Sequence, residues 1–213
     1  MQPKLQILSP ELPTRVLDEA FALLMTPGIK VQLPEARSLL AEAGAQVDND
    51  SEVVHIPEAL ARAALETVPK AFQLYNTKGE AVIHYGGDAV HFDPGSSGVN
   101  VLDSETMVHR PAVTTDLVKV IMIADTLPQY DAQSTSLVCS EIPKEIGDLY
   151  RLYLVLRYSS KPIVTGAFSV NTTHTMFQML TIFSGGMDAL RQRPIAIFDV
   201  CPSPPLIWSE FGA

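Results

Sequence analysis

Two aspartates follow apolar runs that resemble buried strands. Asp93 comes after residues 90–92, and Asp199 comes after residues 195–198. A carboxylate at the mouth of such a strand must be paired, hydrogen-bonded or used in chemistry, because burying an isolated charge is very unfavourable. Both aspartates are therefore candidates for a charged group in a binding site. The alternatives are that Asp93 caps its own Pro-Gly turn and that Asp199 forms a salt bridge or a loop cap.

Other polar and aromatic residues stand near the ends of expected strands. In βα-repeat enzymes the reactive groups lie where strands end and the following loops begin, so this position selects the candidates. Together with Asp199, the candidate substrate-binding residues are Ser96, Ser97, Gln133, Thr165, Phe168 and Ser203. Serine in a Pro/Gly-rich turn often bonds its own backbone, and this turn chemistry is the alternative for the three serines.

Histidines and cysteines lack the spacings of common metal and hydrolase motifs. None of the five histidines begins a His-Glu-x-x-His sequence, and no Gly-x-Ser-x-Gly is present. We expect no locally encoded metal site and no serine hydrolase chemistry. Cys139 and Cys201 are the two cysteines and lie far apart. A disulfide framework is therefore not indicated, and we expect both to be buried thiols.

The composition excludes some partners and locations. The formal net charge is −9, and no run rich in Lys or Arg is present, which argues against binding to nucleic acid or an anionic membrane. The start of the chain lacks the pattern of a signal peptide, and no apolar run approaches the ~18 residues of a membrane span. Hydrophobic residues make up 46% of the chain, enough for a sizeable core. We expect a soluble, cytoplasmic protein.

The first half of the chain is predicted to contain helices and then β hairpins. Residues 1–70 have helical spacing of apolar residues with Pro and Gly at helix ends, and a short strand at 52–56, which indicates a helical N-terminal cap. Residues 71–111 alternate between apolar and polar residues. We expect a hairpin with its turn at Gly86-Gly87 and a weaker one around residues 103–106, leading into the first barrel strand.

Residues 112–213 are predicted to form βα repeats. Strand-like runs begin near Val90, Asp131, Pro162 and Ile195, roughly every 30 to 40 residues, with helical stripes between them. A dinucleotide-binding sheet should carry Gly-x-Gly-x-x-Gly, which is missing. The predicted fold class is α/β, with the N-terminal helical cap and β ribbons followed by the first half of a TIM-type (βα)8 barrel. Its open sheet edges predict a homo-oligomer.

An ordered set of short segments adds a family resemblance. They are LLAEAGA at 39–45, VHFDPG at 90–95, VLD at 101–103, RPA at 110–112, DLY at 148–150, KPIVTGAFS at 161–169 and CPSPPL at 201–206. This series resembles the N-terminal half of the trimethylamine methyltransferase family, which includes the glycine betaine methyltransferases. The resemblance extends from about Ser9 to the end of the chain.

The resemblance implies a methyltransferase that acts with a corrinoid. The methyl group of trimethylamine, glycine betaine or a similar quaternary amine would pass to the cob(I)amide of a separate corrinoid protein, as in methanogenesis, and this chain would bind no cofactor directly. It implies a substrate-anchoring role for Asp93, our candidate catalytic residue. A pyrrolysine of the trimethylamine enzymes would lie in the second half of the barrel, and this fragment alone would be inactive. The alternative is a self-associating fragment or a small-ligand-binding module without catalysis.

Overall fold

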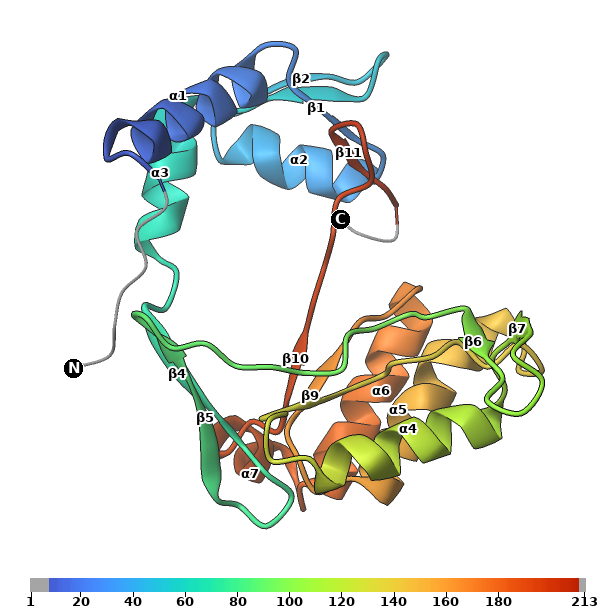
Figure 1. Cartoon of the computed structure of the whole chain (residues 1–213). Coiled ribbons are helices and arrows are strands. Elements are labelled where there is room, and N and C mark those ends of the chain that lie inside the picture. The colour runs from blue at the N-terminus through green and yellow to red at the C-terminus, as the bar shows by residue number, and fades with distance from the viewer. Residues whose placement is uncertain (1–7, 211–213) are drawn as a thin grey trace. The chain divides into compact units, whose positions relative to one another are not determined.

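The computed structural model describes residues 8–210, and the chain forms two compact units (Figure 1). Of the described residues, the first unit contains 8–68 and 201–210, and the second contains 69–200. No helix in the described part of the chain is long and apolar enough to cross a membrane.

The first unit combines three helices with a small sheet. The expected helices form, and the strand expected at 52–56 is present. The helices are α1 (Glu11–Met25), α2 (Pro34–Glu42) and α3 (Glu58–Glu66), and the strands in spatial order are β11 (Ile207–Trp208), β1 (Ile29–Val31), β3 (Val53–His55) and β2 (Gln46–Asp48). Their apolar faces enclose a core around Ile29, Val31 and Val54. The helical cap of the sequence analysis therefore has a sheet as well.

Strand β11 joins the two ends of the sequence. It runs parallel to β1, with Lys30 opposite Ile207 and Val31 opposite Trp208. The sequence analysis placed this segment in the βα repeats, whereas in the structure it completes the sheet of the first unit. Pairing between residues so distant in sequence leaves no local pattern from which to predict it.

The second unit is built on three parallel strands. They are β8 (Gln133–Ser134), β9 (Ile163–Thr165) and β10 (Ala196–Phe198), in the spatial order β10-β9-β8. The helices are α4 (Thr114–Thr126), α5 (Gly147–Tyr158), α6 (Val170–Phe183) and α7 (Met187–Gln192), with a 3₁₀ turn η1 (Lys144–Ile146) before α5. Figure 1 shows α4, α5 and α6 side by side, and α5 contacts both of the others. The βα alternation predicted from residue 131 onward is confirmed.

The strand predicted near Val90 does not form. Phe92 accepts hydrogen bonds from the backbone of residues 131 and 132, and Gly98 bridges to Leu137 in parallel, so the segment still follows the edge of β8. Between these contacts Pro94 has no backbone N–H to donate, and Gly95 has φ of 77°, which interrupts the ladder. The prediction of four strands was therefore wrong by one. No closed barrel forms among residues 8–210.

Two hairpins precede the repeats. β4 (Ala71–Tyr75) pairs with β5 (Ala81–Gly86), and β6 (Asn100–Leu102) pairs with β7 (His109–Pro111). The hairpin of β6 and β7 was predicted. The prediction of a hairpin turn at Gly86-Gly87 was wrong, because β5 ends there and pairs with the preceding strand β4, not with a following strand. The Asn76 side chain accepts hydrogen bonds from the backbone of Lys78 and Glu80, and so stabilises the turn between β4 and β5.

The two cysteines have different environments. Cys139 is buried, as predicted, and Cys201 is exposed, so the prediction of two buried thiols was wrong for Cys201. Cys201 lies in the irregular segment after β10, where no helix or strand covers it. Burial raises the pKa of the Cys139 thiol above its usual value. Its thiolate is therefore disfavoured near neutral pH.

Candidate functional site

Arg151 is a buried cation near the carboxyl ends of β8 and β9. It lies on α5, with a side chain and backbone only 1% exposed. Its Nη1 donates to the backbone oxygen of Thr135 at 3.0 Å and lies 3.5 Å from the Ser97 hydroxyl. The guanidinium also lies over the Phe168 ring, 5.0 Å from the ring centre. The segments after β8 and β9, the loop that carries Ser97 and helix α5 therefore meet at this charge.

The Arg151 charge has no direct carboxylate partner in the described chain. It forms none of the ion pairs seen among residues 8–210, and its Nε has no hydrogen-bond partner there. Burial lowers the pKa of Arg151, while the negative charges of Asp148 and Asp199 oppose this effect. Arginine nevertheless stays protonated in proteins. The result is a desolvated cation with unused donors.

Asp148 fixes the loop that carries Phe168. This carboxylate is 1% exposed and lies at the start of α5. Its Oδ2 accepts hydrogen bonds from the Phe168 backbone N–H at 2.8 Å and the Thr172 hydroxyl at 2.7 Å, and its Oδ1 accepts from the Leu149 N–H. These bonds satisfy the buried charge and hold the turn between β9 and α6. Asp148 therefore positions Phe168 relative to Arg151.

Asp199 stands at the end of β10, where the sequence placed it. Its backbone N–H donates to the oxygen of Thr165 at 2.8 Å, and its side chain is exposed. A Cβ on Gly166 would lie 3.3 Å from the Asp199 carboxylate, so glycine leaves room for this side chain. The negative charge of Asp199 also makes a small contribution that raises the pKa of Arg151. Asp199 thus borders Thr165 and Gly166, at the start of the loop that carries Phe168 to Arg151.

Thr165 and Gln133 are buried and already bonded. The Thr165 hydroxyl lies 3.2 Å from that of Thr135, joining β9 to the residue after β8. The amide of Gln133 donates to the backbone oxygen of Ile121 at 2.9 Å and accepts from the N–H of Ser134. Gln133 therefore connects β8 to α4, and neither of its hydrogen bonds involves Arg151.

Asp93 and the two serines follow one edge of β8. The Asp93 Oδ1 accepts a hydrogen bond from the Gly95 N–H at 2.8 Å, which is the turn cap considered as its alternative role. Because Phe92 bonds the residues before β8, Asp93 lies toward the amino end of that strand. Both serines are exposed, and the Ser97 hydroxyl lies 3.5 Å from Arg151 Nη1. The segment therefore runs from the start of β8 to the candidate site.

Ser203 belongs to the other compact unit. Its backbone N–H and oxygen both bond Ile207, at 2.7 and 2.9 Å, in the turn before β11. The structure therefore groups Ser97, Thr165, Phe168 and Asp199 with Arg151, and does not group Ser203 with them.

A second polar cluster surrounds His91. Its Nδ1 lies 3.2 Å from an Asp131 carboxylate oxygen, an ion-pair distance without hydrogen-bond alignment, and its Nε2 lies 3.0 Å from the His84 backbone oxygen. The Tyr85 ring contacts the His91 ring edge-on, with centres 5.3 Å apart. Burial raises the pKa of Tyr85, and Asp93 and Asp131 add to this effect. In residues 8–210 no three His, Cys, Asp or Glu side chains are placed to hold a metal ion.

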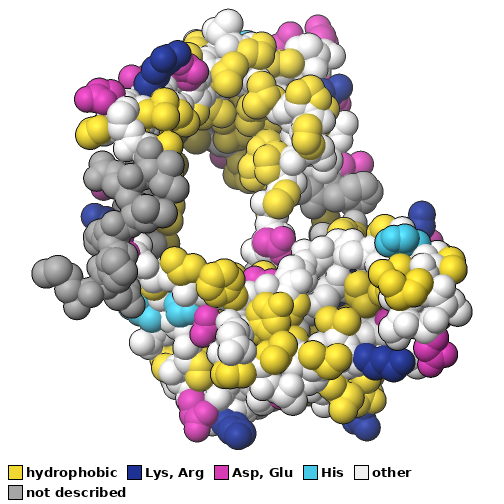
Figure 2. Space-filling view, viewed as in Figure 1, with side chains coloured by type: hydrophobic (Ala, Val, Ile, Leu, Met, Phe, Trp, Pro, Cys, Tyr) yellow, Lys and Arg dark blue, Asp and Glu magenta, His cyan; other side chains and the backbone are white. Residues whose placement is uncertain are grey.

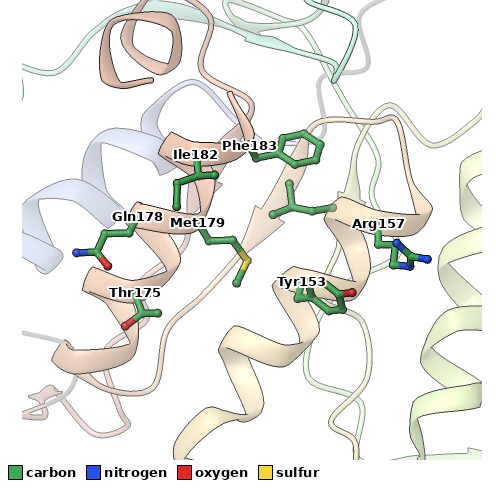
Figure 3. A pocket seen from close by; sticks show the side chains of 8 residues that line it. Tyr153, Arg157, Thr175, Gln178, Met179, Ile182 and Phe183 are labelled. Carbon is green, nitrogen blue, oxygen red and sulfur yellow. The ribbon is translucent and has the colours of Figure 1, made fainter. Parts of the chain in front are cut away.

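A separate apolar groove lies between α5 and α6. Figure 3 shows Tyr153 of α5 and Met179, Ile182 and Phe183 of α6 around it, and its volume is about 540 Å³. Ile182 is 80% exposed. Hydrophobic side chains are also frequent on the visible face of the second unit (Figure 2). The groove is distinct from the Arg151 region, because its lining residues do not include those around Arg151.

The sequence did not point to Arg151 or Asp148 as site residues. The available signal was a pair of charges three residues apart on the helix face that also carries Leu152 and Val155, which are buried. A charged residue on an apolar helix stripe must have a partner or a function. Their burial itself depends on packing that the spacing does not specify.

The fold and the site together define an α/β protein with parallel βα units and a polar, aromatic cluster near the strand ends. The family model described as Trimethylamine methyltransferase (MTTB) matches residues 1–212. The chain belongs to the trimethylamine methyltransferase family.

Curated relatives carry the name trimethylamine methyltransferase MttB. The protein from Desulfitobacterium hafniense is 27% identical over 179 residues, covering 84% of this chain and 36% of that protein. Those from Methanosarcina thermophila and Methanosarcina barkeri are 26% and 28% identical, each covering 86% of this chain and 39% and 38% of the relative. The chain thus spans less than two fifths of the length of these relatives.

Proposed function

We propose that this chain supplies the N-terminal part of the active site of a methylamine or betaine methyltransferase. The substrate would be trimethylamine, glycine betaine or a similar quaternary amine. The methyl acceptor would be a reduced corrinoid held by a partner protein, and this chain would bind no cofactor directly. Family membership supports the reaction class. The observation that carries the site is the grouping of Phe168, Asp199 and Arg151 beside the ends of β9 and β10.

Phe168 and Asp199 are suited to a methylated cation. The Phe168 ring is half exposed (50%), and an aromatic face attracts a quaternary ammonium group. The exposed Asp199 carboxylate adds opposite charge. Because both side chains reach solvent, a bulky group carried by a partner protein has access to a substrate held there. Ser97, which is exposed, would supply a hydroxyl group next to it, while the Thr165 hydroxyl, buried and bonded to Thr135, would hold the strand ends in place.

The reaction changes the charge that these residues face. A corrinoid held by the partner protein would supply the nucleophile for the methyl group. When the carbon–nitrogen bond breaks, its electron pair stays on nitrogen, and a quaternary ammonium becomes a neutral amine. Asp199 therefore attracts the substrate more strongly than the neutral amine first formed, which takes up a proton from water after the methyl transfer. The positive charge on nitrogen is smaller in the transition state than in the substrate, so Asp199 stabilises the transition state less than the bound substrate. Asp199 therefore contributes to substrate binding.

Asp93 has a proposed role as a polar anchor for the substrate. One of its carboxylate oxygens is bonded to the Gly95 N–H, and no hydrogen bond of the other is present among the described residues. In this role Asp93 would combine a turn cap with a charge directed to the cavity of the longer protein. Ser96, Gln133 and Ser203 remain proposed substrate contacts, and no hydrogen bond or ring contact joins them to Arg151 among the described residues.

The proposed reaction is tested with the protein translated from the complete gene. It is mixed with a reduced corrinoid protein and, separately, with trimethylamine, glycine betaine and other quaternary amines. Mass spectrometry then measures the demethylated amine. We expect demethylation of at least one compound, reduced by Phe168→Ala and unchanged by Phe177→Ala, an exposed phenylalanine on α6. Failure with every amine contradicts the proposal.

Self-association is a second candidate function. Strand β10 pairs only with β9 among the described residues, and the groove between α5 and α6 exposes Ile182 and Phe183. An open strand edge can pair with another copy, and an apolar groove can be covered by one. Light scattering of the 213-residue chain tests this candidate, and a monodisperse monomer contradicts it.

A further inference from the structure

Arg151 has hydrogen-bonding capacity that the described chain does not use. A guanidinium has five N–H donors. In the structure Nη1 bonds the Thr135 oxygen and makes a long contact with Ser97, and Nε has no partner. The residue is 1% exposed, so water is largely excluded from it. Burying donors without partners is unfavourable, which requires an explanation.

Arg110 and Arg37 are bonded more fully than Arg151. Arg110 bonds both oxygens of Asp116 and one oxygen of Asp103. Arg37, which is also buried, bonds two backbone oxygens and Asn49 and lies 3.8 Å from Glu52. Carboxylates or several oxygens thus accompany these cations, whereas Arg151 has one good hydrogen bond.

The acidic neighbours of Arg151 are occupied or lie too far for an ion pair. Asp148 accepts three hydrogen bonds from Leu149, Phe168 and Thr172. Asp199 acts on Arg151 electrostatically but forms no ion pair with it. These carboxylates moderate the charge and leave the Nε–H donor without an acceptor. An additional anionic group is the partner that a buried guanidinium binds best.

We propose that Arg151 binds the carboxylate of a small ligand. The identity of the ligand rests on the proposed function: an N-methylated amine that also carries a carboxylate. Its carboxylate would accept from Arg151, and its cationic end would lie toward Asp199 and Phe168. The Phe168 ring lies against the guanidinium and is itself half exposed, so it is the side chain that separates Arg151 from solvent on this side and that a bound carboxylate would have to displace. An amine without a carboxylate leaves the Nε–H of Arg151 without an acceptor, and it binds more weakly.

Nuclear magnetic resonance of the arginine Nε–H groups tests this in the protein translated from the complete gene. The Arg151 signal is assigned from its loss in Arg151→Lys. Glycine betaine and acetate are titrated, with sodium chloride and tetramethylammonium chloride as controls at equal ionic strength. We expect a saturable shift of the Arg151 signal with both carboxylates and none with the controls. No shift, or an equal shift with chloride, overturns the proposal.

Variants separate binding from folding. Arg151→Gln should abolish the increase in melting temperature caused by glycine betaine, and Arg157→Gln, an exposed arginine on the same helix, should keep it. Circular dichroism identifies an unfolded Arg151→Gln. In that case Arg151→Lys replaces it, and retention of the full wild-type betaine affinity by Arg151→Lys overturns the proposal, because a lysine lacks the planar set of donors.

The two proposals fail in different ways. Carboxylate binding at Arg151 without methyl transfer by the complete protein contradicts the methyltransferase proposal and supports the Arg151 assignment. Demethylation of trimethylamine without any carboxylate-dependent shift at Arg151 supports the methyltransferase proposal and overturns the assignment.

Discussion

Asp148 and Arg151 lie one turn apart on α5, both buried, without forming an ion pair. The Asp148 carboxylate instead bonds Phe168 and Thr172 across the turn between β9 and α6. The acid of the pair thus orders a loop, and the base keeps free donors beside the ring that this loop carries. This division of roles makes Asp148 a positioning residue and Arg151 a binding group in our proposals.

Replacing Asp148 should loosen the Phe168 loop. Asp148→Ala removes the acceptor of the Phe168 N–H and of the Thr172 hydroxyl. The expected loss in the free energy of unfolding is about 1.5–3 kcal/mol, as for hydrogen bonds to charged groups. Hydrogen exchange at the Phe168 amide should become faster. Thermal unfolding and amide exchange measure the two effects. Asp188→Asn, an exposed acid on α7, is the control, and equal effects of both variants would contradict this role.

Asp199 should affect substrate binding more than turnover. In the complete protein, Asp199→Asn should raise KM for the active methylated amine by up to about 5-fold, since an exposed charge pair contributes at most about 1 kcal/mol. The kcat should change little, because the positive charge of the amine disappears during the reaction. Steady-state kinetics of the variant and of Asp188→Asn give the answer. A fall in kcat at constant KM would argue against this role.

Two substitutions of Asp93 separate its charge from its turn. The Asp93 carboxylate accepts from the Gly95 N–H, and an asparagine oxygen can accept the same bond. If the charge anchors the substrate, Asp93→Asn and Asp93→Ala should both lower turnover in the complete protein while the melting temperature of Asp93→Asn stays unchanged. Activity assays and thermal unfolding compare the two. Full activity of Asp93→Asn would contradict the anchoring role and leave capping of the turn as the role of Asp93.

The Arg110 network should make part of the stability depend on acid pH. Hydrogen bonds from the Thr106 backbone, and then from Arg110, lower the pKa of Asp103 from 3.8 to about 2, and Arg110 lowers the pKa of Asp116. Lowered pKa values mean that the stabilisation is present above about pH 4 and is lost as the pH falls toward 2. Carboxyl titration by nuclear magnetic resonance measures both groups.

The Arg110 network has a direct control. Arg110→Gln should raise the pKa of Asp116 toward its usual value, because Arg110 is the largest cause of the shift. The pKa of Asp103 should stay partly lowered by the Thr106 and Glu105 backbone groups. An unchanged pKa of Asp116 in this variant would show that Arg110 does not hold that carboxylate in solution.

Several elements could be predicted because their signals are local. The apolar stripes of α4, α5 and α6 and the runs that become β9 and β10 repeat at short spacing, and secondary structure of this kind depends on neighbours in sequence. The positions of Thr165, Phe168 and Asp199 near strand ends followed from the same pattern. The hairpin around residues 103–106 was predicted for a similar reason, since the Asp103 side chain bonds the turn backbone.

Local signals failed where two of them competed. Gly86-Gly87 resembles a hairpin turn, but the turn at Asn76 pairs β5 with β4 instead. The run before Asp93 resembles a strand, but Pro94 and Gly95 interrupt it, and its backbone bonds only the residues that flank β8, at Phe92 and Gly98. In both cases the alternation of apolar and polar residues is present, and backbone hydrogen bonding decided which strand, if any, the segment pairs with.

By itself, the sequence determined the βα succession, the strand-end positions of the site candidates and the family resemblance, because each depends on residues close together in the chain or on their order. Tertiary structure decided that Arg151 and Asp148 are buried, that Gln133 bonds α4, and that β11 completes a sheet with β1. Burial and long-range pairing arise when distant segments exclude water together. Which donors then remain unpaired depends on that packing.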